Sequence, residues 1–527
     1  MTFISSTGTG LLDRVAASRA ALQSSTAAAS SRAQATSPAA STRVSLGAAN
    51  DVVYVRPATG GSTRAWTTPP NDKDTISTLM ARNSGRDAHG LADRWRGLGG
   101  ALLSQLAKDG TSYKQTLADF VPTVSGADGT DPTAAVSPEE AQAQALGGVS
   151  INATQVELKI QTRSGQTVQL KIAVNDGSQN RASGLEVEVT SSGTLSAAER
   201  SALSDLAGGL DRALEGLGQG APRLDLSGLM NYDSTVLSSL DLKVDTPNVA
   251  TSDGTVSSTA SLGSFALHLG SDRKTVALKG ASGELSMNVD ATAPIGTVDP
   301  AKRQAAILKS LERIDAAAER GHADELLVGL FKDAFKQLQA PPADADKAAA
   351  DAARARKDQD PASIAVTPAV SALSPALEQQ VQPLRSGLAD FDAHFSGDFE
   401  KTNRFGGVKE KGHAEYRIGQ KTTTRADPAA AAPDAMSITQ TQTETLDANW
   451  QKTRTLMLDT GRGNYDAYKV QDSKTVTTLI DTAKGQIARA LRKTDEHSLK
   501  TIDEIENFRS RAHSGAPQDR QFVERLV

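Results

Sequence analysis

Hydrophobic and polar residues alternate most strictly between residues 154 and 190. Apolar side chains occupy every second position in 156–160, a turn containing serine and glycine follows, and the alternation resumes in 168–174. A period of two places the apolar side chains on one face of a strand, so the two runs predict a hairpin with one buried face. A third alternating run at 185–189 predicts a third strand beside it.

The spacing of apolar residues changes to steps of three and four after these strands. Ser196 stands three residues before Glu199, which is the spacing of a capping box at the start of a helix. The leucines that follow share one helical face: Leu203, Leu206, Leu210, Leu214 and Leu217. We expect an amphipathic helix that lies on the sheet.

Four more alternating runs come next, separated by clusters of Gly, Ser, Asp and Asn residues. They cover 240–244, 264–269, 274–279 and 283–289. Short runs at this spacing predict an antiparallel meander.

Two helices are expected after the meander. Asp299 is a suitable N-cap, and Pro300 follows it at the first helical position, where the missing N–H group of proline does no harm. The first helix runs to Gly321 and the second through Leu338. Because the pair carries a wide apolar stripe, another layer must cover it.

The N-terminal part has weaker patterns. Residues 51–57 alternate as a short strand would, while apolar residues in 76–121 recur at steps of three and four. This second pattern predicts a small helical pair. Residues 1–50 are rich in alanine, serine and threonine and poor in acidic residues, so we expect a disordered low-complexity tail.

Residues 340–372 shift to alanine, proline and charged residues, a composition typical of a linker. The segment 376–395 after it fits both a helix and a strand. Pro383 interrupts the helical pattern, so we expect a helix to about Arg385 and a strand from Leu388.

The last 150 residues are rich in threonine and alternate only weakly up to about Ile480. These pieces, which include residues 454–459, predict a second antiparallel sheet with polar outer faces. Apolar residues at helical spacing then predict helices at 482–493 and 495–512.

Together these elements predict an α+β protein with several domains, in which antiparallel sheets pack against amphipathic helices. The expected parts are a disordered tail at 1–50, a mostly helical region at 51–147, an α+β domain at 148–339, a linker at 340–372 and a threonine-rich sheet with C-terminal helices at 373–527.

Composition excludes several functions. The net charge of −5 and the aromatic content of 4% argue against binding to nucleic acid. The chain has no cysteine, which excludes disulfides, thiolate nucleophiles and sulfur-ligated metal sites. No apolar run reaches the ~18 residues needed to cross a bilayer, so we expect a soluble protein without a transmembrane segment, either cytoplasmic or exported by a non-Sec route.

The first 50 residues contain no continuous apolar run of the kind that a Sec signal needs. Arg19 interrupts the apolar face that Leu11, Val15 and Leu22 would form on a helix, so a presequence is also disfavoured. An inert tail and an uncleaved export signal of the type III or flagellar kind remain. A reporter fused to residues 1–50 that is not exported by such an apparatus would exclude the second alternative.

No assembled catalytic motif is present. The histidines are too far apart in sequence for a zinc helix motif: His89, His268, His322, His394, His413, His497 and His513. The nucleophile motif GxSxG and the P-loop signature are missing as well. We therefore predict no catalytic, cofactor-binding or metal-binding residue.

Several residues and stretches are weaker candidates for catalysis or ligand binding, and each has a structural explanation. His322 beside Asp324 and Glu325 is expected in a solvated first turn of a helix, and His268 on the polar side of its strand. The glycine-containing stretch at 216–220 is expected to end a helix. The one at 280–284 is expected to form the turn between two strands. Arg462 lies between two glycines and could bind an anion, but a hairpin turn is the favoured interpretation. Asp344, Asp346 and Asp351 have a calcium-like spacing, which a charged linker explains better. Residues 409–417 fit a contact surface or a solvated strand.

Two stretches resemble a family of uncharacterised bacterial proteins linked to the cell surface or the flagellum. They are ELKIQTRSGQTVQLKI, with the following GLEVEVTSSGTLSAAERSALSDLAGGLDRAL, and TLMLDTGRGNYDAYKVQDSKTVTTLID. The resemblance covers less than a fifth of the chain and implies a bacterial origin, but no activity and no site residue.

We therefore expect a non-catalytic bacterial structural or interaction protein whose partner is a protein or a surface. One alternative is a hydrolase with a dispersed active site, which requires a deep pocket where an acid or a serine meets a histidine. The other alternative is a cytoplasmic scaffold.

Overall fold

The computed structural model describes residues 63–71, 73–85, 88, 90–120, 138–177, 183–247, 262–291, 299–340, 373–426 and 435–527. All of these residues belong to one compact unit, Gly60–Val527. The expected tail at 1–50, the strand at 51–57 and the linker beyond residue 340 lie outside the described residues.

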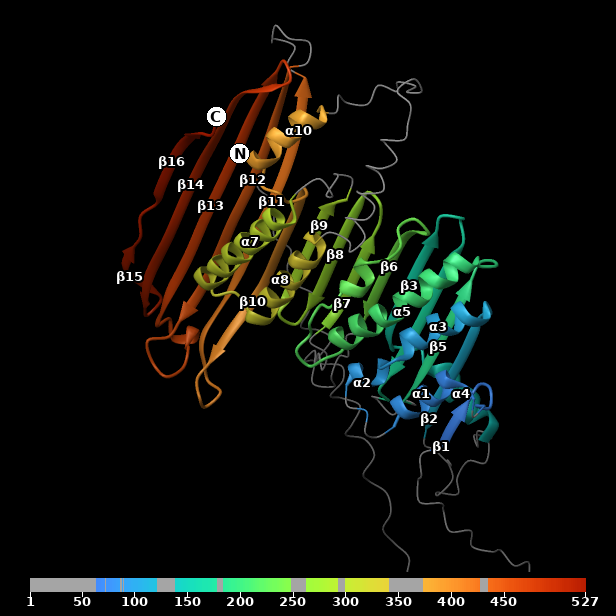
Figure 1. The fold of residues 1–527 in the computed structure, drawn as a ribbon. Helices are drawn as coiled ribbons and strands as arrows, with labels where there is room; N and C mark the ends of the chain where they lie inside the picture. The colour runs from blue at the N-terminus through green and yellow to red at the C-terminus, as the bar shows by residue number, and fades with distance from the viewer. Residues whose placement is uncertain are drawn as a thin grey trace, which may run out of the picture. The chain divides into compact units, whose positions relative to one another are not determined.

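The described residues build one 16-stranded antiparallel sheet (Figure 1). Its strands are β1 Thr63–Trp66, β2 Tyr113–Phe120, β3 Thr154–Thr162, β4 Thr167–Asn175, β5 Ser183–Ser191, β6 Leu237–Asp245, β7 Leu262–Leu269, β8 Arg273–Gly280, β9 Gly283–Asp290, β10 Phe391–Thr402, β11 Val408–Ala426, β12 Met436–Lys452, β13 Tyr465–Ala483, β14 Gln486–Glu506, β15 Arg509–Ser514 and β16 Gln518–Arg525. Their spatial order is β1-β2-β5-β4-β3-β6-β7-β8-β9-β10-β11-β12-β13-β14-β15, and β16 also pairs with β14.

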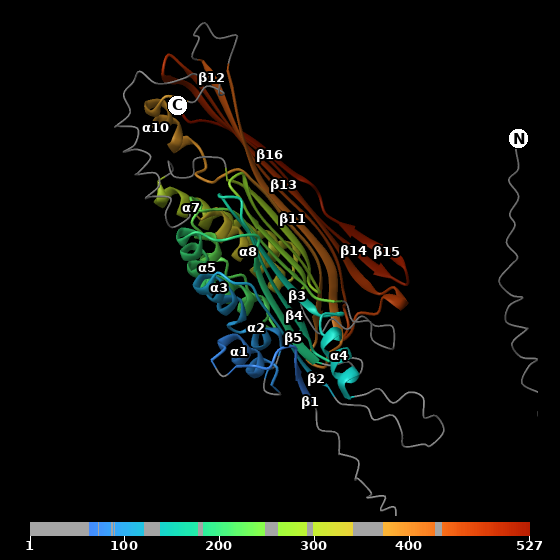
Figure 2. The same ribbon diagram turned by 90° about the vertical axis from the view of Figure 1, so that its right-hand side faces the viewer.

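Helices cover mainly one face of this sheet, as Figure 2 shows edge-on. The helices are α1 Thr75–Asn83, α2 Leu91–Trp95, α3 Leu98–Asp109, α4 Pro138–Gly148, α5 Ala197–Leu217, α6 Ser227–Met230, α7 Pro300–Gly321, α8 Glu325–Gln339 and α10 Pro375–Val381, with 3-10 turns η2 Gln382–Leu384 and η3 Thr460–Arg462. Only α4 is seen on the other face, where Ala145 packs against Ala118 of β2. We call the face that carries α5, α7 and α8 the helix face, and the opposite one the open face.

Alternation along the strands explains which face is buried. In β3 every second residue is buried, with Val156, Leu158 and Ile160 under the helices. A single cluster of buried apolar side chains runs from Ile76 to Val470. One hydrophobic core therefore supports most of the sheet.

The local predictions for the middle of the chain are confirmed. The hairpin β3–β4 and its third strand β5 form as expected, and β6 to β9 form the meander. The capping box at Ser196 and Glu199 opens α5, and Asp299 caps α7. The ambiguous segment is α10 followed by β10 from Phe391.

The predicted second sheet is wrong, because the two expected sheets are one. Strand β9 pairs with β10, with Phe391 opposite Val289. The helical hairpin α7–α8 covers this junction: the ring of Phe331 on α8 meets Phe395 of β10 edge-on at 5.2 Å. The threonine-rich strands thus continue the core of the first half, and the described residues give no support for separate domains.

Three further element predictions are wrong. Residues 113–120 form strand β2, although their apolar spacing fits a helix. Residues 482–512 form the strands β13, β14 and β15, and 454–459 is a loop. The reason at 482–512 is turn geometry: Lys484 and Gly485 both have positive φ, as do Asn507 and Phe508, which makes two-residue hairpin turns.

The long strands β13 and β14 extend beyond the helices. Near one end α10 packs Leu377 and Val381 against Ile438 and Ile480. Strands β15 and β16 pair with separate parts of β14 and are exposed at every residue. Both faces of β15 and β16 are therefore exposed to solvent.

Candidate functional site

The described histidines lie mostly in cross-strand pairs. Four of them face an aspartate directly across the sheet, with Nδ1–Oδ1 distances of 2.6–2.7 Å: His268 with Asp241, His413 with Asp398, His497 with Asp519, and His513 with Asp503. Opposite polar partners of this kind stabilise a sheet. His268 thus lies on the polar side of its strand, as expected. Its side chain is only one third exposed and is hydrogen-bonded to Asp241. His89 lies outside the described residues.

One of these pairs has a serine neighbour. The Oγ atom of Ser396 lies 3.0 Å from Nε2 of His413, whose Nδ1 lies 2.7 Å from Asp398. The order of groups is that of a serine hydrolase triad. However, the Asp398 side chain is 87% exposed, whereas the acid of such a triad is buried so that it fixes the histidine.

The large groove among the described residues does not contain this triad. A groove of about 830 Å³ lies on the open face, where Asn288, Asp392, Gly419 and Lys421 line it. Neither histidine nor serine is among its described lining residues. Nor do the described parts of the chain bring together three or more residues suited to hold a metal ion.

His322 has a different environment from the one expected. It forms the C-cap of α7 with a positive φ of 57°, and its ring stacks on Trp450 at 4.3 Å. Burial lowers the pKa of His322, and the nearby Lys401 and Lys500 act in the same direction, while Glu410 opposes them. The expectation of a solvated residue is therefore wrong: His322 attaches the end of α7 to the sheet.

Two arginines attach the rest of α7. The Nε atom of Arg313 donates to Glu444 at 2.7 Å, and the hydroxyl of Tyr416 donates to the same carboxylate at 2.9 Å. Burial, followed by the Glu444 charge, raises the pKa of Tyr416. Arg320 binds Asp472 of β13 and Ser498 of β14. These contacts hold α7 against the strands β11 to β14.

The most unusual surface is the end of the long strands where three turns meet. We call it the loop end and define it as residues 400–411, 452–466 and 504–511. The side chain of Asn403 donates to the carbonyl of Leu456 at 2.8 Å, which joins the first turn to the second. The backbone N–H of Phe508 donates to the carbonyl of Gly463 at 3.2 Å, which joins the second turn to the third.

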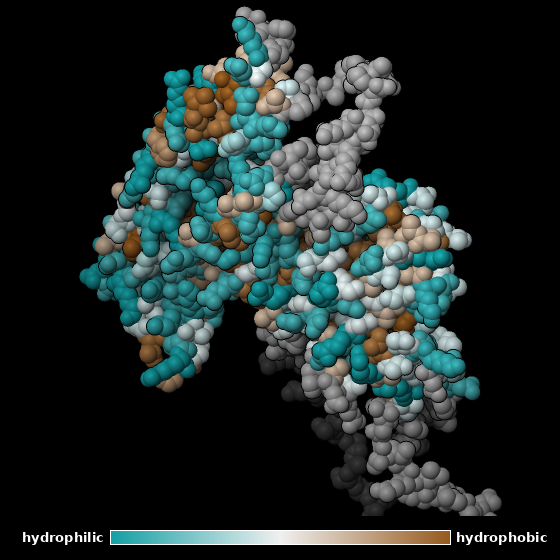
Figure 3. Space-filling view, in the orientation of Figure 1, coloured by the Kyte–Doolittle hydropathy of each residue, from teal (hydrophilic) through white to brown (hydrophobic). Residues whose placement is uncertain are grey.

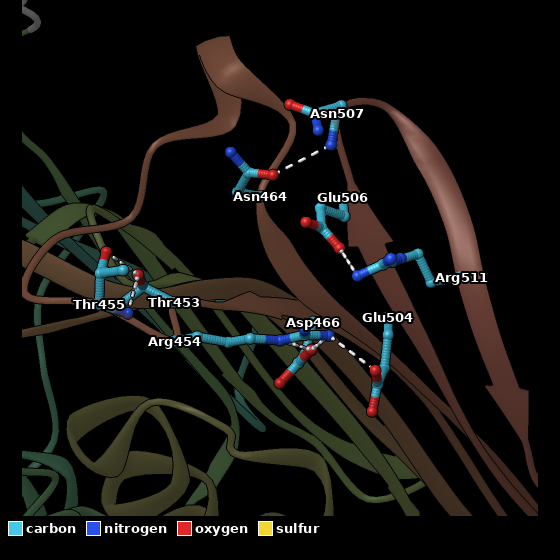
Figure 4. A network of polar contacts seen from close by, with 9 residues as sticks. All are labelled: Thr453, Arg454, Thr455, Asn464, Asp466, Glu504, Glu506, Asn507 and Arg511. Carbon is cyan, nitrogen blue, oxygen red and sulfur yellow. Dashed lines mark hydrogen bonds and ion pairs between the residues drawn. The ribbon is translucent and has the colours of Figure 1, made fainter.

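A polar network fixes the geometry of the loop end (Figure 4). Arg454 donates to Asp466 of β13, from Nε at 2.6 Å, and forms an ion pair with Glu504 of β14 at 3.3 Å. The hydrogen bond with Asp466 raises the pKa of Arg454. Nearby, the side chain of Asn464 accepts from the N–H of Asn507, and Arg511 binds Glu506. The turns are therefore tied together across three neighbouring strands.

Large apolar side chains project from this fixed frame into solvent. Phe405 is 70% exposed, Leu456 66%, Met457 56% and Phe508 68%. In the space-filling view, brown apolar side chains are visible at the lower end of the long strands (Figure 3). Single exposed apolar residues are common, but a group of four at one end is not, and such groups mark interaction sites.

The sequence analysis identified none of these four residues as part of an interaction surface. They lie in three separate turns, and only the sheet brings those turns together. One local signal was available: Asn507 is followed by Phe508, whereas a two-residue hairpin turn normally takes Asn-Gly. Arg462, considered as an anion ligand, lies in the predicted turn, where Asp459 pairs with Asn464.

Comparisons with protein-family models, with curated proteins and with solved structures gave no match for this chain. Within the described segments, no helix has both the length and the apolar character needed to cross a membrane.

Proposed function

We propose that this chain is a non-catalytic interaction protein of bacterial origin that binds a partner protein or a surface through its loop end. The observation that carries the proposal is the group of four exposed apolar side chains on hydrogen-bonded turns. Keeping such side chains in water is unfavourable by about 1.5–3 kcal/mol for each one that a partner would bury. Binding removes this cost, and the fixed frame limits the entropy lost on association.

A labelling experiment tests this proposal without knowledge of the partner. The chain has no cysteine, so one introduced thiol reports on one position. Thr455 is exposed within the loop end, and Thr455→Cys leaves all four apolar side chains in place. We expect maleimide to label it about fivefold more slowly in native cells than in the purified protein, because a bound partner shields it.

The matched control is Ser271→Cys, an exposed residue in the turn between β7 and β8. Its labelling rate should be equal in cells and in purified protein. Equal rates for both variants in the two settings would contradict the proposal, since the loop end would then be free in the cell.

A hydrolase is the second candidate function, and the contacts of Ser396, His413 and Asp398 are the observation that favours it. A fluorophosphonate probe reacts with an activated serine. We expect no labelling of the wild-type chain, because Asp398 is too exposed to organise His413. Labelling that is lost in both Ser396→Ala and His413→Ala would support the hydrolase instead.

Export by a non-Sec route is a further part of the proposal. It rests on the composition of residues 1–50 and on the resemblance to bacterial surface-linked or flagellum-linked proteins. A cytoplasmic scaffold would use the same loop end, so the labelling experiment does not depend on where the protein resides.

A further inference from the structure

The form of the loop end restricts what it can bind. Phe405, Leu456 and Phe508 stand on the outer ends of turns, and they do not line the groove of the open face. A folded protein partner usually matches surfaces of complementary shape around a packed centre. Separate projecting side chains are suited to insertion into a soft apolar medium, as in helices and loops that enter the boundary between lipid headgroups and acyl chains.

Phe508 occupies a backbone conformation that its turn does not favour for it. Its φ is +62°, after Asn507 at +49°, in a position where glycine is the preferred residue. A bulky residue with positive φ is uncommon and carries strain. In spite of this strain, the turn holds a large apolar ring at the tip of the hairpin. Such strain is expected where the ring has a role outside the fold.

The charges around these side chains are predominantly positive. The loop end holds nine Lys or Arg residues and six Asp or Glu residues, in a chain whose net charge is −5. Within the described part of the chain, six of these cations are exposed and have no carboxylate within ion-pair distance: Lys401, Arg404, Lys409, Lys411, Lys452 and Arg509. Three other arginines pair with acidic neighbours inside the loop end: Arg454, Arg462 and Arg511.

Cations and apolar groups are also interleaved at short range. The guanidinium carbon of Arg404 lies 4.6 Å from the centre of the Phe405 ring. At a lipid surface such a pair can place the ring among the acyl chains while the guanidinium remains at the headgroups.

We propose that the loop end binds the surface of a lipid bilayer that contains anionic lipid. Phe405, Leu456, Met457 and Phe508 enter the boundary region, and the unpaired lysines and arginines contact the headgroups. This inference rests on the proposed function, because it names the partner of the same loop end.

Co-sedimentation of the full chain with lipid vesicles tests the inference. We expect binding to vesicles of phosphatidylcholine with about 30% phosphatidylglycerol, weaker binding to pure phosphatidylcholine, and a decrease as salt is raised. The variant Phe405→Ser, Leu456→Ser, Met457→Ser, Phe508→Ser should lower the partition coefficient about tenfold or more. The variant Arg404→Gln, Lys409→Gln should lower it only for the anionic vesicles.

A matched control is Phe522→Ser, Val523→Ser on β16. These side chains are also exposed, at 52% and 62%, but lie outside the loop end, so vesicle binding should not change. Circular dichroism of each variant verifies that its fold is intact, and the substituted side chains contribute little to the core.

The outcomes separate this inference from the proposed function. If Thr455→Cys is shielded in cells but the chain does not bind vesicles, the inference that the loop end binds a bilayer would be overturned, and a protein would remain as the partner. Equal binding to neutral and anionic vesicles would overturn the role of the cations. No shielding and no vesicle binding would contradict both proposals.

Discussion

Replacing Phe331 by alanine is expected to lower the free energy of unfolding by about 3–5 kcal/mol. Phe331 on α8 is fully buried, and its ring meets Phe395 of β10 at 5.2 Å and Tyr416 of β11 at 6.4 Å, both edge-on. Alanine leaves a cavity at the junction between the two halves of the sheet. Chemical denaturation followed by circular dichroism measures the loss. Leu308→Ala on α7, where the side chain is 51% exposed, is the control and should change the free energy by less than about 0.5 kcal/mol.

The same variant tests whether the halves unfold together. Trp95 reports on the first half and Trp450 on the second, and both are buried in one core. Phe331 packs at the junction of the two halves. In the variant, the unfolding midpoints measured by tryptophan fluorescence and by hydrogen exchange of β4 and β12 should therefore all fall to the same lower denaturant concentration. If only the unfolding midpoint of β12 fell, a common core would be contradicted. That result would support the separate domains expected from the sequence.

The sequence predicted those parts of the fold in which local signals agree. Residues 154–217 combine alternation, a turn and a capping box, and the structure forms each of them as β3, β4, β5 and α5. Each element there could be recognised from residues close to it in sequence. This agreement between local preference and final structure is typical of sequences that specify one fold.

The C-terminal strands could not be predicted in the same way. Leu499, Ile502 and Ile505 have helical spacing, but in the structure Leu499 lies opposite Gln471 and Ile502 opposite Tyr468. Pairing with β13 on one edge and with β15 and β16 on the other supplies backbone hydrogen bonds in place of those of a helix. Tertiary context of this kind decides strand formation more than the residues themselves do. The junction between β9 and β10 joins residues that are about a hundred positions apart, so no local pattern marks it.

The loop end was beyond sequence analysis for a related reason. Each of its turns contains one or two apolar residues, which alone would need no explanation. Only the order of β10 to β15 places Phe405, Leu456 and Phe508 at one end of the sheet. The contacts of Ser396 with His413 are similar in this respect, because they cross from β10 to β11 at a register that the sequence does not reveal.

Replacing Gly283 by alanine is expected to lower the free energy of unfolding by about 3–5 kcal/mol, close to the effect at Phe331. The sequence explained Gly283 as a turn residue between two strands, and its φ of +130° agrees with that role. The structure adds a second reason: an alanine Cβ would lie 2.3 Å from the carbonyl oxygen of Ser396 and 2.5 Å from Cα of Gly397. Backbone atoms cannot move aside as a flexible side chain can, so β9 and β10 would have to separate where the core crosses between them.

The control for Gly283→Ala is Gly165→Ala in the β3–β4 turn, where φ is +93° and no atom lies within 4 Å of the added Cβ. It carries the backbone strain without the collision and should lower the free energy of unfolding by only about 1 kcal/mol. Thermal or chemical denaturation of both variants measures the difference. If the two substitutions had equal effects, the close approach of β10 to Gly283 would contribute nothing to stability.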